Sequence, residues 1–147
     1  MKPKIFIATP IAGFSDEKVY NNFRIKIKAL TRKLDKNFSI ISEILNISNV
    51  ASYDSPSQSA AKDFQNIESS SIFVLIYPQR MPTSALVELG YALALKKRIL
   101  IITTEQGILP YMLKELDKVY SNVQISYFPN GWDDVDDIIY TFVYNNQ

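Results

Sequence analysis

The sequence contains no cysteine and no histidine among its 147 residues. Without them the chain cannot form a disulfide, present a thiolate nucleophile, build a Ser-His-Asp triad or hold zinc through histidine. Glycine is scarce as well, with 4 residues in all, and neither the GxGxxG pattern of dinucleotide-binding folds nor a Walker A loop occurs. Any catalysis therefore has to use carboxylates, hydroxyls, tyrosines, lysines or arginines.

The sequence also lacks an excess of charge of one sign and a long apolar run. Lysine and arginine total 16 and aspartate and glutamate total 15, so the net charge of +1 gives no electrostatic footprint for nucleic acid. No apolar run approaches the roughly 20 residues that span a bilayer, and residues 1–4 lead into a strand pattern instead of a signal peptide. We therefore expect a cytoplasmic protein without a nucleic-acid or membrane partner, folded as a single domain over residues 1–147.

Short apolar segments alternate along the chain with segments of helical periodicity. Ile72 to Ile76 is an unbroken apolar run, typical of a strand that is covered on both faces in a parallel sheet. The predicted strands are residues 4–8, 38–45, 72–76, 98–103 and 123–128, with a polar loop at 46–57. The predicted helices are residues 16–34, 59–70, 83–96, 108–119, which is interrupted near Pro110, and 132–145. This alternation predicts a doubly wound α/β fold of the flavodoxin or Rossmann type, with helices flanking a five-stranded parallel sheet.

One acidic residue stands within the most apolar helix of the chain. Residues 85–95 are apolar on almost every side, so we expect most of this helix to be buried. Glu88 lies within it, and a carboxylate without a cationic neighbour is costly to bury. Its neighbours three and four positions away carry no positive charge: Ser84, Ala85, Tyr91 and Ala92. Glu88 is therefore the leading catalytic candidate, the alternative being a first-turn carboxylate that stabilises the helix macrodipole.

The loops that follow the strands predict where a ligand binds. In doubly wound folds ligands bind beyond the carboxyl ends of the strands, where the loops at residues 9–14, 77–82 and 103–110 should meet. The candidate substrate-binding residues are Thr9, Pro10, Ile11 and Gly13 in the first loop, with Thr83, Ser84 and Tyr91 around Glu88. Another cluster, Asp133, Asp134, Asp136 and Asp137, stands at a predicted helix start, so we interpret it as capping charge and not as a metal site.

The segment around Glu88 resembles a known enzyme family. The residues that carry the resemblance are Lys62 to Ile67, the apolar strand after them, Glu88 to Ala94 and Lys97 to Leu100. This pattern is similar to that of the nucleoside 2-deoxyribosyltransferase family and its relatives, the deoxynucleoside 5′-monophosphate N-glycosidases, closely over residues 62–103 and more loosely at residues 4–8. The resemblance implies a doubly wound α/β fold and an enzyme that cleaves the N-glycosidic bond of a small-molecule nucleoside or nucleotide.

The resemblance also implies a role for each of two acids. Glu88 would be the nucleophile that attacks the anomeric C1′ carbon and leaves a glycosyl ester for water or a second base to resolve. Asp63 would orient the sugar or help to protonate the departing base. Paired carboxylates around an oxocarbenium-like centre are the usual arrangement for glycosidic cleavage. Such chemistry needs no metal or cofactor, and because relatives complete their pockets at subunit interfaces, a homo-oligomer (dimer or higher) is expected.

The loop before Glu88 separates the members of this group. Between Arg80 and Ser84 it lacks the aspartate with which the transferases contact the base. The monophosphate N-glycosidases carry a serine near this point, so Ser84 and Thr83 would bind phosphate through hydroxyls and free backbone amides, or else cap the helix. Two alternatives stay open. One is a TIR-like NAD hydrolase, although Val87 stands where such domains often carry a tryptophan just before the glutamate. The other is an inactive nucleotide-sensing module. The identity of the base, the kind of sugar, and hydrolysis versus transfer are also open.

Overall fold

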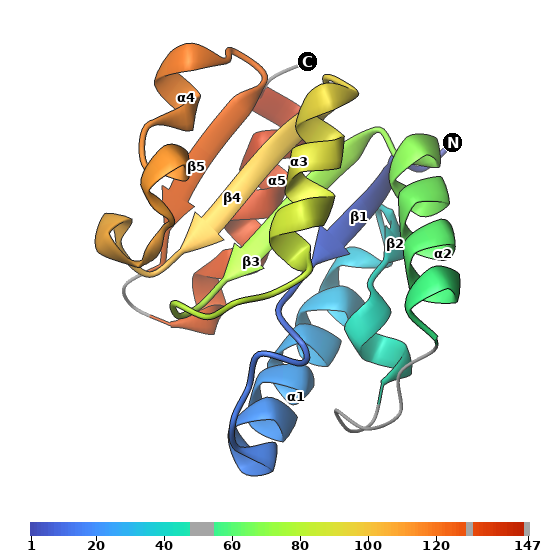
Figure 1. The fold of residues 1–147 in the computed structure, drawn as a ribbon. Coiled ribbons are helices and arrows are strands. Elements are labelled where there is room, and N and C mark those ends of the chain that lie inside the picture. The colour runs from blue at the N-terminus through green and yellow to red at the C-terminus, as the bar shows by residue number, and fades with distance from the viewer. Residues whose placement is uncertain (48–54, 129–130, 146–147) are drawn as a thin grey trace.

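A computed structural model describes residues 1–47, 55–128 and 131–145 of the chain (Figure 1). Its centre is one parallel sheet with the strand order β2-β1-β3-β4-β5. The strands are β1 (Lys4–Ala8), β2 (Ser39–Ile41), β3 (Ile72–Tyr77), β4 (Arg98–Thr103) and β5 (Val123–Tyr127). The predicted doubly wound α/β fold with five parallel strands is confirmed.

Helices cover both faces of the sheet, as Figure 1 shows. The longer helices are α1 (Glu17–Leu34), α2 (Pro56–Ser69), α3 (Ala85–Ala94) and α5 (Val135–Asn145). The helices α2 and α3 contact each other on one face, while α1 and α5 contact each other on the other. None of the helices in the described part of the chain is long and apolar enough to cross a bilayer.

The two central strands form the core because both of their faces are covered. Every residue of β3 is buried, and in β4 only Arg98 is partly exposed. The side chain of Arg98 lies over the Phe142 ring and donates a 2.7 Å hydrogen bond to the Phe142 carbonyl, which holds α5 against β4. On β1 and β3, the rings of Phe6 and Phe73 stack with centroids 5.7 Å apart. Continuous apolar runs therefore become central strands, as their sequence indicates.

The first two helices begin at side chains that cap them. The Asp16 carboxylate accepts a 2.7 Å hydrogen bond from the Lys18 amide, so α1 begins where the sequence predicts. Helix α2 begins at Pro56, earlier than the predicted Ser59, because Ser55 and Gln58 form a capping box with proline in the first turn. The last residues of the predicted loop at 46–57, from Ser55 on, are thus cap or helix, and its residues 48–54 lie outside the described residues.

The predicted second strand at 38–45 is too long, and its correction matters for the site. Strand β2 ends at Ile41 and is followed by a 3-10 helix, η1 (Glu43–Asn46). Helix α1 draws this segment away from the sheet: the Arg24 guanidinium donates to the Ile44 carbonyl at 3.1 Å, and the Tyr20 hydroxyl donates to the Ile47 carbonyl at 2.6 Å.

One further expectation was wrong in extent. Helix α3 runs from Ala85 to Ala94 and not over 83–96, and it is less buried than its composition suggests, since the Val87 side chain is 62% exposed. The segment 108–119, predicted as a helix interrupted near Pro110, is indeed broken at that proline, which cannot continue a helix, and it consists of short pieces. These pieces are η2 (Gln106–Ile108), η3 (Tyr111–Leu113) and α4 (Leu116–Val119).

Aromatic rings connect the loop after β1 with the segment after β5. Phe14, at the end of the loop, lies 5.2 Å from Phe23 of α1. Phe23 lies 5.6 Å from Trp132, at the start of η4 (Trp132–Asp134), and Trp132 lies 5.3 Å from Phe128 (all distances between ring centroids). The first loop is therefore packed through aromatic contacts against α1 and the C-terminal part of the chain.

Candidate active site

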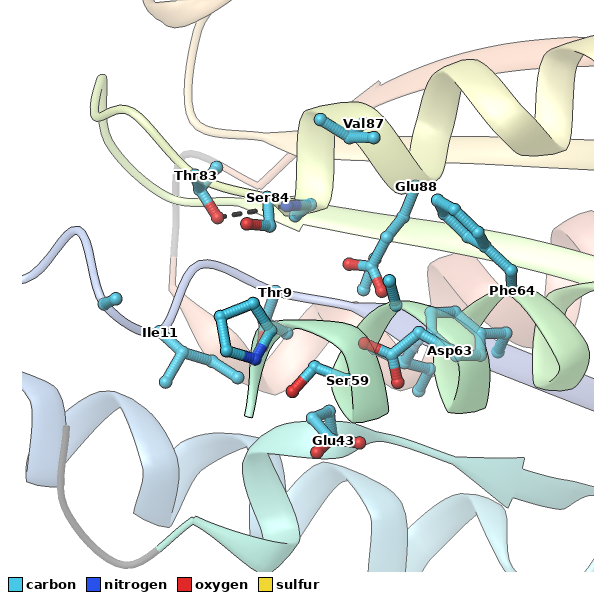
Figure 2. Close-up of a pocket in the computed structure, with 17 residues that line it drawn as sticks. Thr9, Ile11, Glu43, Ser59, Asp63, Phe64, Thr83, Ser84, Val87 and Glu88 are labelled. Atoms are coloured by element: carbon cyan, nitrogen blue, oxygen red, sulfur yellow. Dashed lines mark hydrogen bonds between the residues drawn. The ribbon is translucent and has the colours of Figure 1, made fainter. Parts of the chain in front are cut away.

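A pocket of about 410 Å³ opens beyond the carboxyl end of β1, between α2 and α3 (Figure 2). Its volume is that of a small-molecule site. The described residues that line it are Phe6, Ile7, Ala8, Thr9, Ile11, Ala12, Glu43, Pro56, Ser59, Ala60, Asp63, Phe64, Thr83, Ser84, Ala85, Val87 and Glu88. It thus lies where the doubly wound topology predicts a ligand site.

Glu88 from α3 and Asp63 from α2 both project into this pocket (Figure 2). The two helices contact each other next to these acids, through Phe64, which follows Asp63, and Tyr91, which lies about one turn after Glu88. The rings of Phe64 and Tyr91 pack with centroids 4.6 Å apart, and the Tyr91 hydroxyl donates a hydrogen bond to the Glu68 carboxylate on α2. Because these contacts fix α2 against α3, they bring the two acids into one site.

The pKa of Glu88 is raised from its usual 4.5 to about 9. The largest cause is burial, which removes water from the carboxylate. The negative charge of Asp63 and a hydrogen bond with its side chain raise the pKa further, and the charge of Glu43 adds to them. Glu88 therefore holds a proton at neutral pH and is hydrogen-bonded to Asp63.

A third acid, Glu43, lines the pocket from η1. The turn that follows β2 carries it there, and its carboxylate lies 3.7 Å from the Lys62 ammonium on the outer side of α2. Sequence reasoning missed Glu43 because it placed this residue inside a strand. The signal that could have found it is the Glu43-Ile44-Leu45-Asn46 segment itself, in which the polar residues do not alternate as in a half-buried strand.

Three buried polar atoms in the pocket have no hydrogen-bond partner within the described chain. They are the Thr9 hydroxyl, the Ser59 hydroxyl and one carboxylate oxygen of Asp63. Buried polar atoms are nearly always satisfied in native proteins, so such a cluster calls for a ligand or water. Thr9 was predicted from its place after β1, whereas Ser59 was assigned only to the helix start.

Thr83 and Ser84 both line the pocket, but they differ in what their side chains do. The Thr83 hydroxyl accepts a 3.2 Å hydrogen bond from the Ala85 amide, so it caps α3 (Figure 2). The Ser84 side chain makes no capping hydrogen bond and is exposed. The next two amides, of Leu86 and Val87, donate to the Thr83 and Ser84 carbonyls at 3.2 and 3.0 Å. The amides of this first turn are therefore engaged within the chain.

Three predicted substrate-binding residues, Pro10, Gly13 and Tyr91, are not among the described residues that line the pocket, whereas Ile11 is. Gly13 lies in a contact between two loops: a Cβ atom there would overlap the Pro82 carbonyl oxygen and lie 2.9 Å from the Met81 sulfur. Tyr91 serves the contact between α2 and α3 described above. The structure thus places Gly13 and Tyr91 as supports of the pocket walls.

Comparisons with known proteins agree with this architecture. No protein-family model matches the sequence, and a comparison with curated proteins found no match. The structure is similar to that of the CMP N-glycosidase BcmB from Clostridium botulinum, with a TM-score of 0.67 over 92% of this chain and 97% of that chain, at 19% sequence identity. The likeness shows a shared doubly wound fold, which is the fold that the sequence resemblance implies.

Proposed function

We propose that this protein is an enzyme that cleaves the N-glycosidic bond of a nucleoside or a nucleoside 5′-monophosphate. The observation that carries the proposal is the hydrogen-bonded pair of Glu88, whose raised pKa keeps it protonated at neutral pH, and Asp63, in a pocket of nucleoside size. Such a pair supplies both a nucleophile and an acid without a metal. The fold shared with a CMP N-glycosidase supports the same chemistry.

The first step breaks the bond between sugar and base. As positive charge develops at C1′, an ionised Glu88 becomes favourable, and the shared proton moves to Asp63. A Glu88 oxygen then forms a bond to C1′, and the electron pair of the C1′–N bond goes to the base nitrogen. Asp63 gives its proton to the departing base. The products are a glycosyl ester of Glu88, the neutral base and an ionised Asp63.

The second step releases the sugar. The ionised Asp63 takes a proton from a water molecule, whose oxygen attacks C1′ as the ester bond to Glu88 breaks. Glu88 leaves as a carboxylate and Asp63 is protonated again, which restores the one shared proton of the pair. In a transferase the nitrogen of a second base takes the place of this water, so the same two acids serve either outcome.

Chromatography of reaction products tests this proposal. The protein is incubated with nucleosides and deoxynucleosides, their 5′-monophosphates and NAD, in parallel with the Glu88→Ala variant. We expect free base from a nucleoside or monophosphate in the wild type and a loss of at least about 1,000-fold in the variant, because the nucleophile is gone. Adding a second free base distinguishes transfer from hydrolysis, since only a transferase yields the exchanged nucleoside.

The matched variant Asp63→Asn keeps the size of the side chain but removes the acid. We expect a strongly reduced rate with retained ligand binding, because an amide cannot protonate the base. A wild-type rate in Asp63→Asn would exclude the role of Asp63, and full activity in a folded Glu88→Ala protein would exclude the mechanism. Nicotinamide release from NAD alone would favour an NAD hydrolase instead, and ligand binding without release of any base would favour a sensing module.

A further inference from the structure

The charged side chains that line the pocket are all acidic. Glu43, Asp63 and Glu88 line it, and none of its described lining residues is a lysine or an arginine. Even with Glu88 protonated, the lining acids carry a net negative charge at neutral pH.

Two features offset this charge only in part. The Lys62 ammonium lies 3.7 Å from Glu43, but Lys62 stands outside the lining and its side chain is about half exposed. The N-terminus of α3 contributes a partial positive charge of about half an elementary unit. The amides that would hold an anion there, those of Ala85, Leu86 and Val87, already donate to the Thr83 hydroxyl and to the Thr83 and Ser84 carbonyls. A phosphate dianion would therefore meet repulsion from the acids without a full charge to balance it.

The unpartnered polar atoms favour a different kind of ligand group. The Thr9 and Ser59 hydroxyls can each donate and accept a hydrogen bond, whereas the Asp63 oxygen, when ionised, can only accept. A phosphate dianion has no donor for Asp63. A sugar hydroxyl has both a donor and an acceptor, so it can satisfy all three atoms. The polar part of the pocket thus matches the hydroxyls of an uncharged sugar.

On the basis of the proposed function, we infer that the substrate is an uncharged nucleoside, and that the pocket discriminates against the same nucleoside carrying a 5′-phosphate. The acids that line the pocket set this preference by charge, with Glu43 as the member that takes no part in bond cleavage. The Thr9, Ser59 and Asp63 side chains bind the sugar hydroxyls. In this respect the site differs from that of a CMP N-glycosidase, whose substrate carries the phosphate.

Matched substrate pairs test the inference. The value of kcat/KM for base release is measured with cytidine and CMP, adenosine and AMP, and the corresponding deoxy pairs. We expect the nucleoside to be preferred by at least about tenfold in the pair that is cleaved, and the preference to shrink with rising salt, because repulsion between charges is screened. An equal or higher kcat/KM for the monophosphate would overturn the inference.

Charge-neutralising variants identify the residue responsible. Glu43→Gln should reduce the ratio of nucleoside to monophosphate kcat/KM several-fold, since it removes one negative charge at nearly constant volume. Glu115→Gln is the control: it removes the same charge from an exposed position beside α4, which packs on β5 at the other edge of the sheet, and should leave the ratio unchanged. An unchanged ratio in Glu43→Gln would remove Glu43 from this role.

A binding measurement separates failure of the inference from failure of the proposed function. In Glu88→Gln, which should not turn over, calorimetric titration with each nucleoside and its 5′-monophosphate reports affinity alone. Tighter binding of the nucleoside, even if no substrate is cleaved, would support the inference while the proposed catalysis fails. Tighter binding of the monophosphate would overturn the inference whether or not the wild type is active.

Discussion

Glu88 is the residue at which function opposes stability. In the unfolded chain its carboxyl group ionises near pH 4.5, whereas in the folded protein it keeps its proton up to about pH 9. A group with a raised pKa contributes its full stability below pH 4.5 and loses that contribution as the pH rises toward 9. The contribution of Glu88 to the free energy of unfolding is therefore smallest at alkaline pH, where its carboxyl group ionises in the folded protein as well.

We predict that Glu88→Gln stabilises the protein at neutral pH. Glutamine has the shape of a protonated glutamate but does not ionise. The variant therefore avoids the free-energy cost of keeping a carboxyl group protonated in the folded state at a pH where the unfolded state would release the proton. The free energy of unfolding should exceed that of the wild type by on the order of 1–3 kcal/mol at pH 8, with little difference at pH 4. Urea unfolding across this pH range measures it, with the exposed substitution Glu105→Gln as a control that should show no such trend.

The pH dependence of the rate is a second prediction for the same pair. In the proposed mechanism, cleavage requires one proton on the two acids, because Glu88 has to be ionised while Asp63 protonates the base. When the pair loses that proton, at about pH 9, the base can no longer leave as a neutral molecule, so kcat/KM should fall about tenfold for each further pH unit. A rate that keeps rising through pH 10 would contradict the shared proton.

The sequence predicts some of these residues and not others for a physical reason. Glu88 stands out because an acid among apolar helical residues has no local explanation, and Asp63 follows from the resemblance. Glu43 and Ser59 have no such signal, since their neighbours in the chain explain a polar residue equally well. Only the turn after β2 and the early start of α2 carry them to the pocket.

At the scale of elements, the pocket depends on a close contact between two loops. Gly13 in the loop after β1 faces the Pro82 carbonyl and the Met81 side chain in the loop before α3. We predict that Gly13→Ala lowers the free energy of unfolding by about 1–3 kcal/mol and raises KM, because the added methyl group has to push these loops apart. Gly107→Ala is the matched control, since a Cβ atom there meets nothing within 4 Å.

Thermal unfolding and steady-state kinetics of both variants measure the effect. Equal stability and KM in Gly13→Ala and the wild type would show that the loops move apart without cost. The contact also explains a limit of sequence reasoning: the need for glycine at position 13 arises from a loop more than 60 residues away, which no local pattern reports.

The elements themselves were predictable to the extent that their patterns are local. Strands β1 and β4 occupy the predicted residues, because continuous apolar runs become buried strands. The ends of β2 and α3 were not predictable from local patterns, since they are set by contacts with other elements. The Arg24 and Tyr20 hydrogen bonds pull residues 44–47 toward α1, and the sheet covers only one face of α3, which leaves Val87 exposed.

For the whole molecule, we predict a homo-oligomer. Support comes from large apolar side chains at the surface, including Val87, which is 62% exposed at the rim of the pocket, and Leu95, which follows the end of α3. A second copy seated on α3 would cover them and complete the pocket wall. Light scattering should therefore give a mass of at least twice 16.8 kDa, and a single-chain mass at all concentrations would contradict the prediction.

The aromatic contacts that begin at Phe14 have a spectroscopic consequence. The sequence contains 1 tryptophan, Trp132, and its indole is packed against Phe23, which in turn packs against Phe14. Phe14 ends the loop that supplies Thr9 and Ile11 to the pocket. The tryptophan fluorescence of the protein thus comes from one indole that is linked by two ring contacts to the loop at the candidate site. The emission of Trp132 should therefore report, without an added label, a change in the packing of the loop that supplies Thr9 and Ile11.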